Sequence, residues 1–466
     1  MKIVRVIAMK RNQQDLTSGP LLSGIIAYTV PIILTSVLQL LFNAADLVVV
    51  GRFRGSLAVG AVGSTGSLTT LIVNLFVGLS VGAGVSVAHA IGAKQEKMLQ
   101  RTIHTALFVA VAGGAALTII GVSLSGVFLR LMDTPAEILP LSTQYMQIYF
   151  CGMVFNLVYN FCAAILRAAG DTKSPLLYLS IAGVLNVVLN LFFVVVCGMS
   201  VAGVALATII SQCLSAVLVV RALMRRSDGC RLDLGQIMLH KAQLLRILRI
   251  GIPAGIQASL FAISNVIVQS SVNSFGDTVV SGNAAAANIE GFVYVAMNAF
   301  SQTAVNYTGQ NTGAGRFDRV RKIFFLCTVC VAVTGIVMGG GVYLGARPLL
   351  SIYITDSPEA ITYGIIRMSF VALFYFLCGM MDVATGCLRG LGSSLAPMII
   401  SVLGVCGIRL GWIFTIFRDP RFHSLESLFI SYPISWTITF VIEMMAFFVI
   451  YRRRMKQAAN SLTPVL

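Results

Sequence analysis

The chain alternates between long apolar runs and short polar connections. Each apolar run contains about 20 or more residues, which is enough to cross a hydrocarbon core of ~30 Å as an α-helix. This pattern predicts an all-α polytopic membrane protein with twelve transmembrane helices. The predicted spans are 20–49, 58–92, 98–129, 138–165, 175–197, 201–224, 244–273, 279–312, 322–346, 360–388, 396–417 and 426–451.

Composition and charge support this class. Of the 466 residues, 57% are hydrophobic and only 11% are charged, which excludes an ordinary soluble globular protein. The formal net charge is +16, but most lysines and arginines lie in the even-numbered loops and at the termini, which argues against a nucleic-acid partner. By the positive-inside rule, both termini should be cytoplasmic. We expect a multi-pass protein of a bacterial plasma membrane, inserted by its first span, because no signal-peptide cleavage site precedes that span.

The second half of the sequence repeats the first. Pro31 in TVPII coincides with Pro253 in GIPAG, 222 residues later. Similarly, AIGAKQ at 90 matches NTGAGR at 311, and ILRAAGDTKSP at 165 matches CLRGLGSSLAP at 387. The repeat therefore predicts two pseudo-symmetric six-helix lobes with parallel topology. The expected N-terminal lobe is 1–224, the cytoplasmic linker is 225–243 and the C-terminal lobe is 244–466.

Two facing lobes predict a transporter that works by alternating access. Pro31 and Pro253 each remove an intrahelical hydrogen bond, so both are expected to bend their spans. We interpret the bend at Pro31 as mobile because the same span carries an acidic residue. A static kink remains the alternative, above all for Pro253.

Four acidic residues fall within predicted spans: Asp46, Glu290, Asp382 and Glu443. An ionised carboxylate at the centre of a bilayer costs about 2.5–3.5 kcal/mol on insertion scales. Each of the four should therefore face protein, water or a cation. Glu443 lies near the basic end of the last span, and we interpret it as a structural carboxyl group with a hydrogen-bonding partner.

Asp46 stands out because other polar side chains share its helical face. Gln39, Asn43 and Asp46 are spaced by four and three residues, which places them on one side of a helix. In the fifth span, Asn186 and Asn190 share a face in the same way. These faces are expected to point into the protein. Hydrogen bonds between helices alone are the structural alternative.

Several motifs together resemble the MATE (multidrug and toxic compound extrusion) transporters. They are the pattern Pro31…Gln39-x3-Asn43-x2-Asp46, the IGAKQ loop, LNVVLN at 185–190, and the matched turns LRAAGDTKSP and LRGLGSSLAP. The resemblance covers about residues 15 to 455. It implies two six-helix lobes and export of organic cations and other amphipathic compounds in exchange for sodium ions or protons.

The resemblance also implies a cation-coupling site in the N-terminal lobe. The implied site consists of Asp46, Tyr145, Asn160, Asn186 and Thr208. The related pattern often has aspartate where this chain has Asn190, so the site here carries one charge fewer. One carboxylate with neutral oxygen ligands suits a monovalent ion such as Na⁺. Protonation of Asp46 is equally compatible, so both Na⁺ and H⁺ stay open as coupling ions.

The C-terminal lobe has a different charge pattern. Asp382 lies 222 residues after Asn160 and carries a charge that the first half lacks. No acid occurs in the seventh span, so a complete second cation site is not expected. We assign Glu290 and Asp382, with Gln39 and Asn43, to a substrate cavity. Structural pairing of the two acids with Arg367 or Arg409 is the alternative.

Three classes of function compete. A secondary active exporter of small molecules fits the doubled lobes, and the absence of a Walker A motif excludes a P-loop ATPase. A lipid-linked oligosaccharide flippase of the wider superfamily should have a cavity rich in Arg or Lys. An intramembrane enzyme is disfavoured because no HExxH or paired catalytic motif occurs in the spans. We expect a monomer without a bound cofactor.

Overall fold

The computed structural model describes residues 14–355 and 357–462, and every regular element in this part of the chain is helical. Twelve helical segments, with each bent or interrupted helix counted once, correspond to the predicted spans, mostly within a few residues. The N-terminal half contains α2 (Leu21–Arg54), α3 (Ser56–Gly92), α4 (Glu96–Leu131), α5 (Leu139–Cys151) with α6 (Met153–Ala168), α7 (Lys173–Leu191) with the π-helical η1 (Phe192–Val196), and α8 (Val201–Met224).

The C-terminal half repeats this order. It contains α9 (Lys241–Asn273), α10 (Asp277–Gly313), α11 (Phe317–Leu344), α13 (Pro358–Phe370) with α14 (Tyr375–Gly390), α15 (Leu395–Ser401) with the π-helical η3 (Val402–Gly407) and α16 (Ile408–Phe414), and α17 (Leu425–Leu462). Short helices η2 (Leu234–Gln236), α12 (Ala346–Ser351) and η4 (Pro420–Phe422) lie in the connections. Each half contains one bent span at the matching position. The fourth span bends by 49° between α5 and α6, and the tenth bends by 45° between α13 and α14.

Helix α10 differs in composition from the other spans. Among the described residues, nine helices and the two bent pairs are long and apolar enough to cross a membrane, and α10 is not among them. It is rich in alanine, asparagine and glycine, and most of its second half is buried against other helices. Because α10 packs largely against protein, it does not need the apolar surface of a lipid-facing span.

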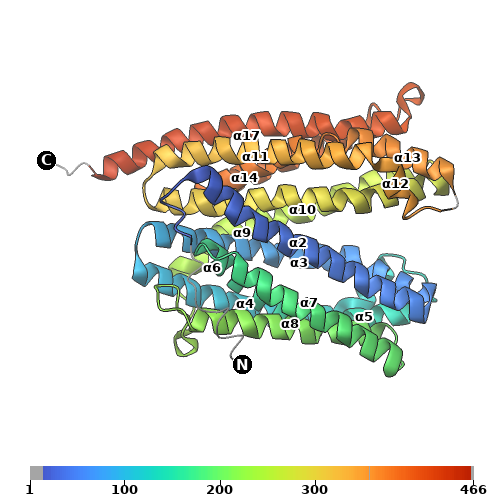
Figure 1. Ribbon diagram of the computed structural model, residues 1–466, viewed down its shortest axis with the longest axis horizontal. Helices are drawn as coiled ribbons and strands as arrows, with labels where there is room; N and C mark the ends of the chain where they lie inside the picture. The colour runs from blue at the N-terminus through green and yellow to red at the C-terminus, as the bar shows by residue number, and fades with distance from the viewer. Residues whose placement is uncertain (1–13, 356, 463–466) are drawn as a thin grey trace.

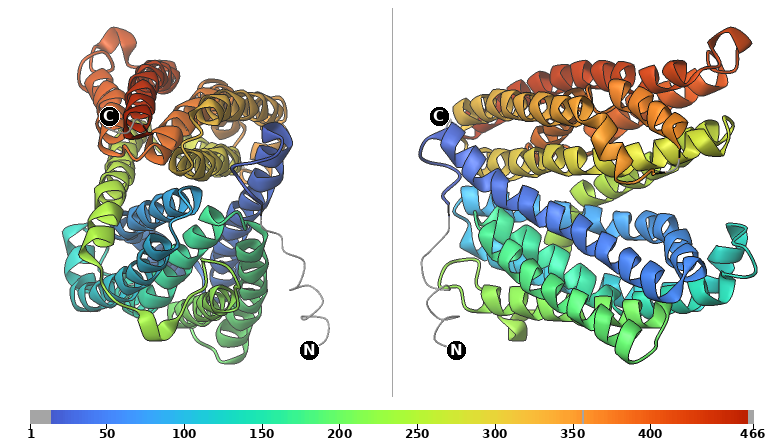
Figure 2. Two further views of the ribbon diagram at one scale, coloured as in Figure 1. Left: turned by 90° about the vertical axis from the view of Figure 1, so that its left-hand side faces the viewer. Right: turned by 45° about the vertical axis from the view of Figure 1, so that its right-hand side comes forward.

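The helices form two lobes, with α3–α8 in one and α10–α17 in the other (Figures 1 and 2). The longest contact between the halves runs along α3 and α9. Glycines allow the two backbones to touch there: a Cβ atom at Gly78 would lie 2.3 Å from the nitrogen of Gly255, and one at Gly82 would lie 2.3 Å from the oxygen of Ile247. Small residues are typical of such close helix pairs in membranes.

Helix α2 connects the two lobes. Its first half joins the buried core of the C-terminal half, where Tyr28 packs edge-on against Tyr307 and the hydroxyls of Thr29 and Thr303 lie 2.8 Å apart. Its second half packs against α7. In Figure 1, α2 accordingly crosses from the side of α10 to that of α7. The first helix of the predicted lobe 1–224 thus packs against helices of both halves.

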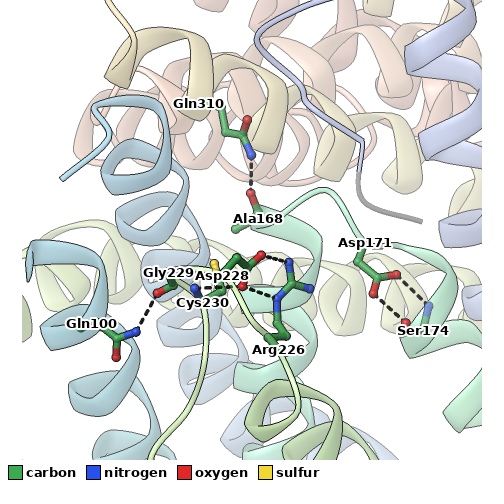
Figure 3. Close-up of polar contacts among 9 residues, drawn as sticks. All are labelled: Gln100, Ala168, Asp171, Ser174, Arg226, Asp228, Gly229, Cys230 and Gln310. Atoms are coloured by element: carbon green, nitrogen blue, oxygen red, sulfur yellow. Dashed lines mark hydrogen bonds and ion pairs between the residues drawn. The ribbon is translucent and has the colours of Figure 1, made fainter. Parts of the chain in front are cut away.

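One end of the bundle, which we call the basic end, carries the linker between α8 and α9 and the C-terminal end of α17 (Figure 1). The linker is folded against the N-terminal half (Figure 3). Arg226 pairs with Asp228, with 2.9 Å between Nε and Oδ1, and Gln100 donates a hydrogen bond of 2.8 Å to the carbonyl of Gly229. The linker is therefore held against α4 at this end.

Candidate functional site

A cavity of about 990 Å³ lies between the two lobes. Helices α2, α3, α5, α6, α7 and α8 line one side, and α9, α10, α14, η3, α16 and α17 line the other. A cavity of this size accommodates a drug-sized molecule. Its wall includes seven of the residues singled out in the sequence: Gln39, Asn43, Asp46, Asn160, Asn186, Thr208 and Asp382.

Asp46 is held in a network of amides and a hydroxyl. Asn190 Nδ2 donates a hydrogen bond to Asp46 Oδ1 and contacts Asn186 Oδ1 at 3.2 Å. The side chain of Thr208 also interacts with the Asp46 carboxylate. These contacts join α2, α7 and α8. Asn190 is fully buried behind Asp46 rather than lining the cavity.

The oxygens around Asp46 fit a hard cation. Asn190 Oδ1 is buried and has no hydrogen-bond donor among the described residues. An unpaired buried acceptor is costly, and a cation or a proton on a neighbouring group relieves that cost. No group of three or more His, Cys, Asp or Glu side chains suited to a metal occurs in the described residues, so a cation here would have mainly neutral oxygen ligands.

Two other residues of the implied cation site are arranged differently. Asn160 lines the cavity, but its Nδ2 atom donates to the carbonyl and side-chain oxygens of Asn156 at 2.9 and 3.1 Å. Tyr145 stacks on Tyr149 with 6.0 Å between the ring centroids, and it is Tyr149 that lines the cavity. Both rings are within electrostatic range of Asp46. Tyr145 therefore stacks against a cavity-lining tyrosine and is not itself one of the lining residues.

Asp382 is the acidic residue of the opposite wall. Its Oδ2 atom is buried without a hydrogen-bond partner. The guanidinium of Arg389, two turns further along α14, lies within electrostatic range and donates to Gln257 Oε1 at 2.8 Å. Arg389 thus acts on the Asp382 carboxyl group through its charge, since no ion pair joins the two within the described residues.

Three arginines line the cavity, and the sequence interpretation missed two of them. Arg167 and Arg389 are the matched arginines of ILRAAG and CLRGLG, 222 residues apart. That symmetry was the available signal. Arg409, which was considered as a pairing partner and as a candidate basic residue of the cavity, lies over the ring of Tyr432 at 3.9 Å and donates to Ser435 Oγ at 3.1 Å. The cavity therefore combines two carboxylates with three guanidinium groups.

Glu290 does not belong to the cavity wall. It is 1% exposed, and its Oε2 atom accepts hydrogen bonds from Nε and Nη2 of Arg367 at 3.0 and 2.8 Å. A third bond of 2.8 Å joins Arg367 Nη1 to Asn283 Oδ1. The assignment of Glu290 to a substrate cavity is corrected by this geometry, because the paired carboxylate faces the interior of the C-terminal lobe.

Neither proline of the repeat touches the central cavity. Pro31 is buried within α2, where Thr35 Oγ1 donates to its carbonyl at 2.7 Å. Pro253 lies within α9 and lines a separate pocket at the basic end. Glu443, on α17, accepts hydrogen bonds of 2.8 and 2.5 Å from Thr385 and Ser401, as expected for a structural carboxyl group.

Backbone contacts close the cavity toward the basic end. A Cβ atom at Gly92 of α3 would lie 2.0 Å from the carbonyl oxygen of Gln310 on α10, and one at Gly313 would lie 2.2 Å from that of His89. Two hydrogen bonds flank this crossing: His89 Nε2 lies 2.7 Å from the oxygen of Gly390, and Gln310 donates to that of Ala168 at 2.6 Å (Figure 3). We call this crossing of α3 and α10 the basic-end seal.

A family model described as MatE matches residues 31–192 and 253–414, one segment in each half. The chain belongs to the MatE family. This confirms the resemblance inferred from the motifs, and the two matches are those expected of a tandem repeat.

Relatives of known name cover most of the chain. YpnP of Bacillus subtilis, a probable multidrug resistance protein, is 28% identical over 395 residues, covering 85% of this chain and 88% of that protein. NorM of Thermotoga maritima, also a probable multidrug resistance protein, is 26% identical and covers 83% of each chain. A FAD transporter of Shewanella oneidensis is 21% identical over 353 residues, covering 74% of this chain and 77% of that protein.

The fold is shared with a solved transporter. A multidrug resistance MATE family transporter in an outward-facing conformation has a TM-score of 0.89 at 20% identity, covering 96% of this chain and 99% of that chain. The likeness confirms the two-lobed helical fold predicted from the sequence.

Proposed function

We propose that the protein is a secondary active multidrug exporter that moves organic cations and other amphipathic compounds in antiport with Na⁺ or H⁺. Family membership and the relatives named as multidrug resistance proteins support this function over a lipid-linked oligosaccharide flippase. Membership of a transporter family also favours transport over an enzymatic activity.

The observation that carries the proposal is the buried network around Asp46. In our proposal the coupling ion binds the Asp46 carboxylate, and the unpaired oxygen of Asn190 and the hydroxyl of Thr208 complete its environment. Gln39 and Asn43 line the cavity on the same helix, so substrate in the cavity lies beside the ion site. Ion and substrate then compete for one face of α2, which couples their movements.

The driving force is sufficient without ATP. One monovalent cation moving inward is worth about 2.3 kcal/mol per 100 mV. That free energy supports a substrate gradient of about fifty-fold. The lobes alternate between a state closed at the basic end and one closed at the opposite end. The bend at Pro31 takes part because the first half of α2 packs on one lobe and the second half on the other.

The test is efflux from proteoliposomes with sodium and proton gradients imposed separately. Wild-type protein should move a fluorescent organic cation against its gradient with one of the two ions. Asp46→Asn keeps the size of the side chain but removes its charge and its proton exchange, so gradient-driven transport should be lost. Asp318→Asn, an exposed acid at the start of α11, is the matched control and should be unaffected. Near wild-type uphill transport by Asp46→Asn would show that the carboxylate is structural.

The three arginines of the cavity favour a second candidate class of substrate, anionic amphipathic compounds. Arg167, Arg389 and Arg409 outnumber the two cavity carboxylates. A related FAD transporter supports the same possibility. The proteoliposome assay separates the two classes when an organic cation and an organic anion of similar size are compared under the same gradient.

We also propose that the basic end faces the cytoplasm, that both termini lie there and that the protein works as a monomer in a bacterial plasma membrane. The distribution of lysines and arginines supports this orientation. The cavity, closed at the basic end, then opens outward. A reporter fused after Leu466 should be active only in the cytoplasm. Activity only on the outer side would reverse the orientation.

A further inference from the structure

A second pocket, of about 940 Å³, lies at the basic end. It is formed by the first half of α9, the turn between α14 and α15, and the last part of α17. It shares no lining residue with the central cavity, so the transport site does not account for it.

The polar side of this pocket is strongly cationic. Arg249 of α9 and Arg453 and Arg454 of α17 line it, and all three are exposed. No Asp or Glu is among its lining residues, and none of the three arginines forms an ion pair within the described part of the chain. Guanidinium groups from two helices therefore line one pocket without an acidic partner among the described residues. Such a group of arginines recognises phosphate through paired N–H donors.

The other side of the pocket is apolar. Leu245 and Ile252 of α9 and Leu395 of α15 line it, with exposed fractions of 56%, 39% and 58%. Leu245 and Ile252 are seven residues apart, which corresponds to about 10 Å along the helix. Leu245 lies about one turn before Arg249 and Ile252 about one turn after it, so exposed apolar side chains flank this arginine along α9. A ligand that fills the pocket has an anionic head and a hydrocarbon chain.

We propose that this pocket binds an anionic phospholipid of the basic-end leaflet. Arg249, Arg453 and Arg454 hold the headgroup phosphate, and one acyl chain lies along Leu245, Ile252 and Leu395. Basic pockets between transmembrane helices on the cytoplasmic side are suited to such headgroups. The proposal concerns a site outside the transport pathway and does not depend on the coupling ion or the substrate.

Native mass spectrometry of the delipidated full-length protein tests the proposal. Phosphatidylglycerol is titrated against zwitterionic phosphatidylcholine of the same acyl composition. Wild-type protein should retain phosphatidylglycerol at a concentration at least about tenfold lower than phosphatidylcholine. Millimolar inorganic phosphate should not displace it, because phosphate lacks the acyl chain. Equal retention of the two lipids, or displacement by phosphate, would overturn the proposal.

Two triple variants show whether the pocket or the general surface charge is responsible. The variant Arg249→Gln/Arg453→Gln/Arg454→Gln should lose the preference for phosphatidylglycerol. The matched control removes three basic charges at the same end but outside the pocket: Arg231→Gln, Arg452→Gln and Lys456→Gln. The control should keep most of the preference. Equal losses in the two triple variants would contradict a defined site.

A further variant tests the pocket with its arginines intact. Leu395→Glu places a carboxylate on the apolar wall at an exposed position, where folding should be unaffected. It should weaken retention of phosphatidylglycerol at least about tenfold, because the added charge repels the phosphate and the apolar contact is lost. Wild-type retention by this variant would count against the proposed occupant.

Discussion

Gly92→Ala should weaken the basic-end seal. The added Cβ atom would lie 2.0 Å from the carbonyl oxygen of Gln310, and neither atom can turn away because each is bonded directly to helical backbone. Restoring an ordinary contact distance of about 3.5 Å requires the helices to separate by about 1.5 Å. Overpacking of this kind costs about 1–3 kcal/mol. Because α3 and α10 touch at this crossing in the state closed at the basic end, that state bears the cost. The equilibrium between this state and states open at the basic end should shift roughly 5- to 150-fold toward the open states.

Amide hydrogen exchange and transport measure this shift. In Gly92→Ala, amides at the ends of α3 and α10 should exchange at least about fivefold faster, in line with the population shift. Active transport should slow because the closed state forms less often. Gly66→Ala in α3 and Gly291→Ala in α10 are matched controls, since their Cβ atoms would meet nothing within 4 Å. Alanine favours helix by about 1 kcal/mol over glycine, so the controls should be neutral or stabilising. Exchange and transport in Gly92→Ala equal to those of the controls would refute the reasoning.

Three other predictions concern charged groups. Asp382→Asn should impair transport of cationic compounds more than that of neutral ones, and equal losses in proteoliposome efflux would argue against substrate attraction. Glu290→Gln should lower the free energy of unfolding by about 3–5 kcal/mol, because it leaves the buried charge of Arg367 without an opposite charge. Thermal unfolding measures this loss. The double variant Glu290→Leu/Arg367→Met removes both charges and should be closer to wild type. Burial raises the pKa of Asp228, but the hydrogen bond and charge of Arg226 outweigh it and hold the net pKa below its ordinary value. Above the ordinary pKa of an aspartate, Asp228 is ionised and the linker amides should be protected from exchange. As the pH falls through the lowered pKa of Asp228, that protection should be lost. The variant Asp228→Asn has no such carboxyl group and should show no such transition.

Hydropathy and the internal repeat predicted the membrane class and the two-lobed helical fold, and the motifs predicted the family. Apolar length determines which segments can cross a bilayer, and this property is local to the sequence. Helical periodicity also placed Gln39, Asn43 and Asp46 on one face, and all three line the cavity. These predictions succeeded because they depend on residues that are close together in the chain.

Tertiary packing decided which faces meet. Glu290 and Arg367 are 77 residues apart, and only the packing of α10 against α13 brings them together. Asn190 reaches Asp46 across 144 residues because α7 packs on the second half of α2. Periodicity assigns a side chain to a helical face but does not name the helix opposite it. The sequence by itself therefore determined which residues are costly to bury, and the fold determined whether each meets an ion pair, an amide or the open cavity.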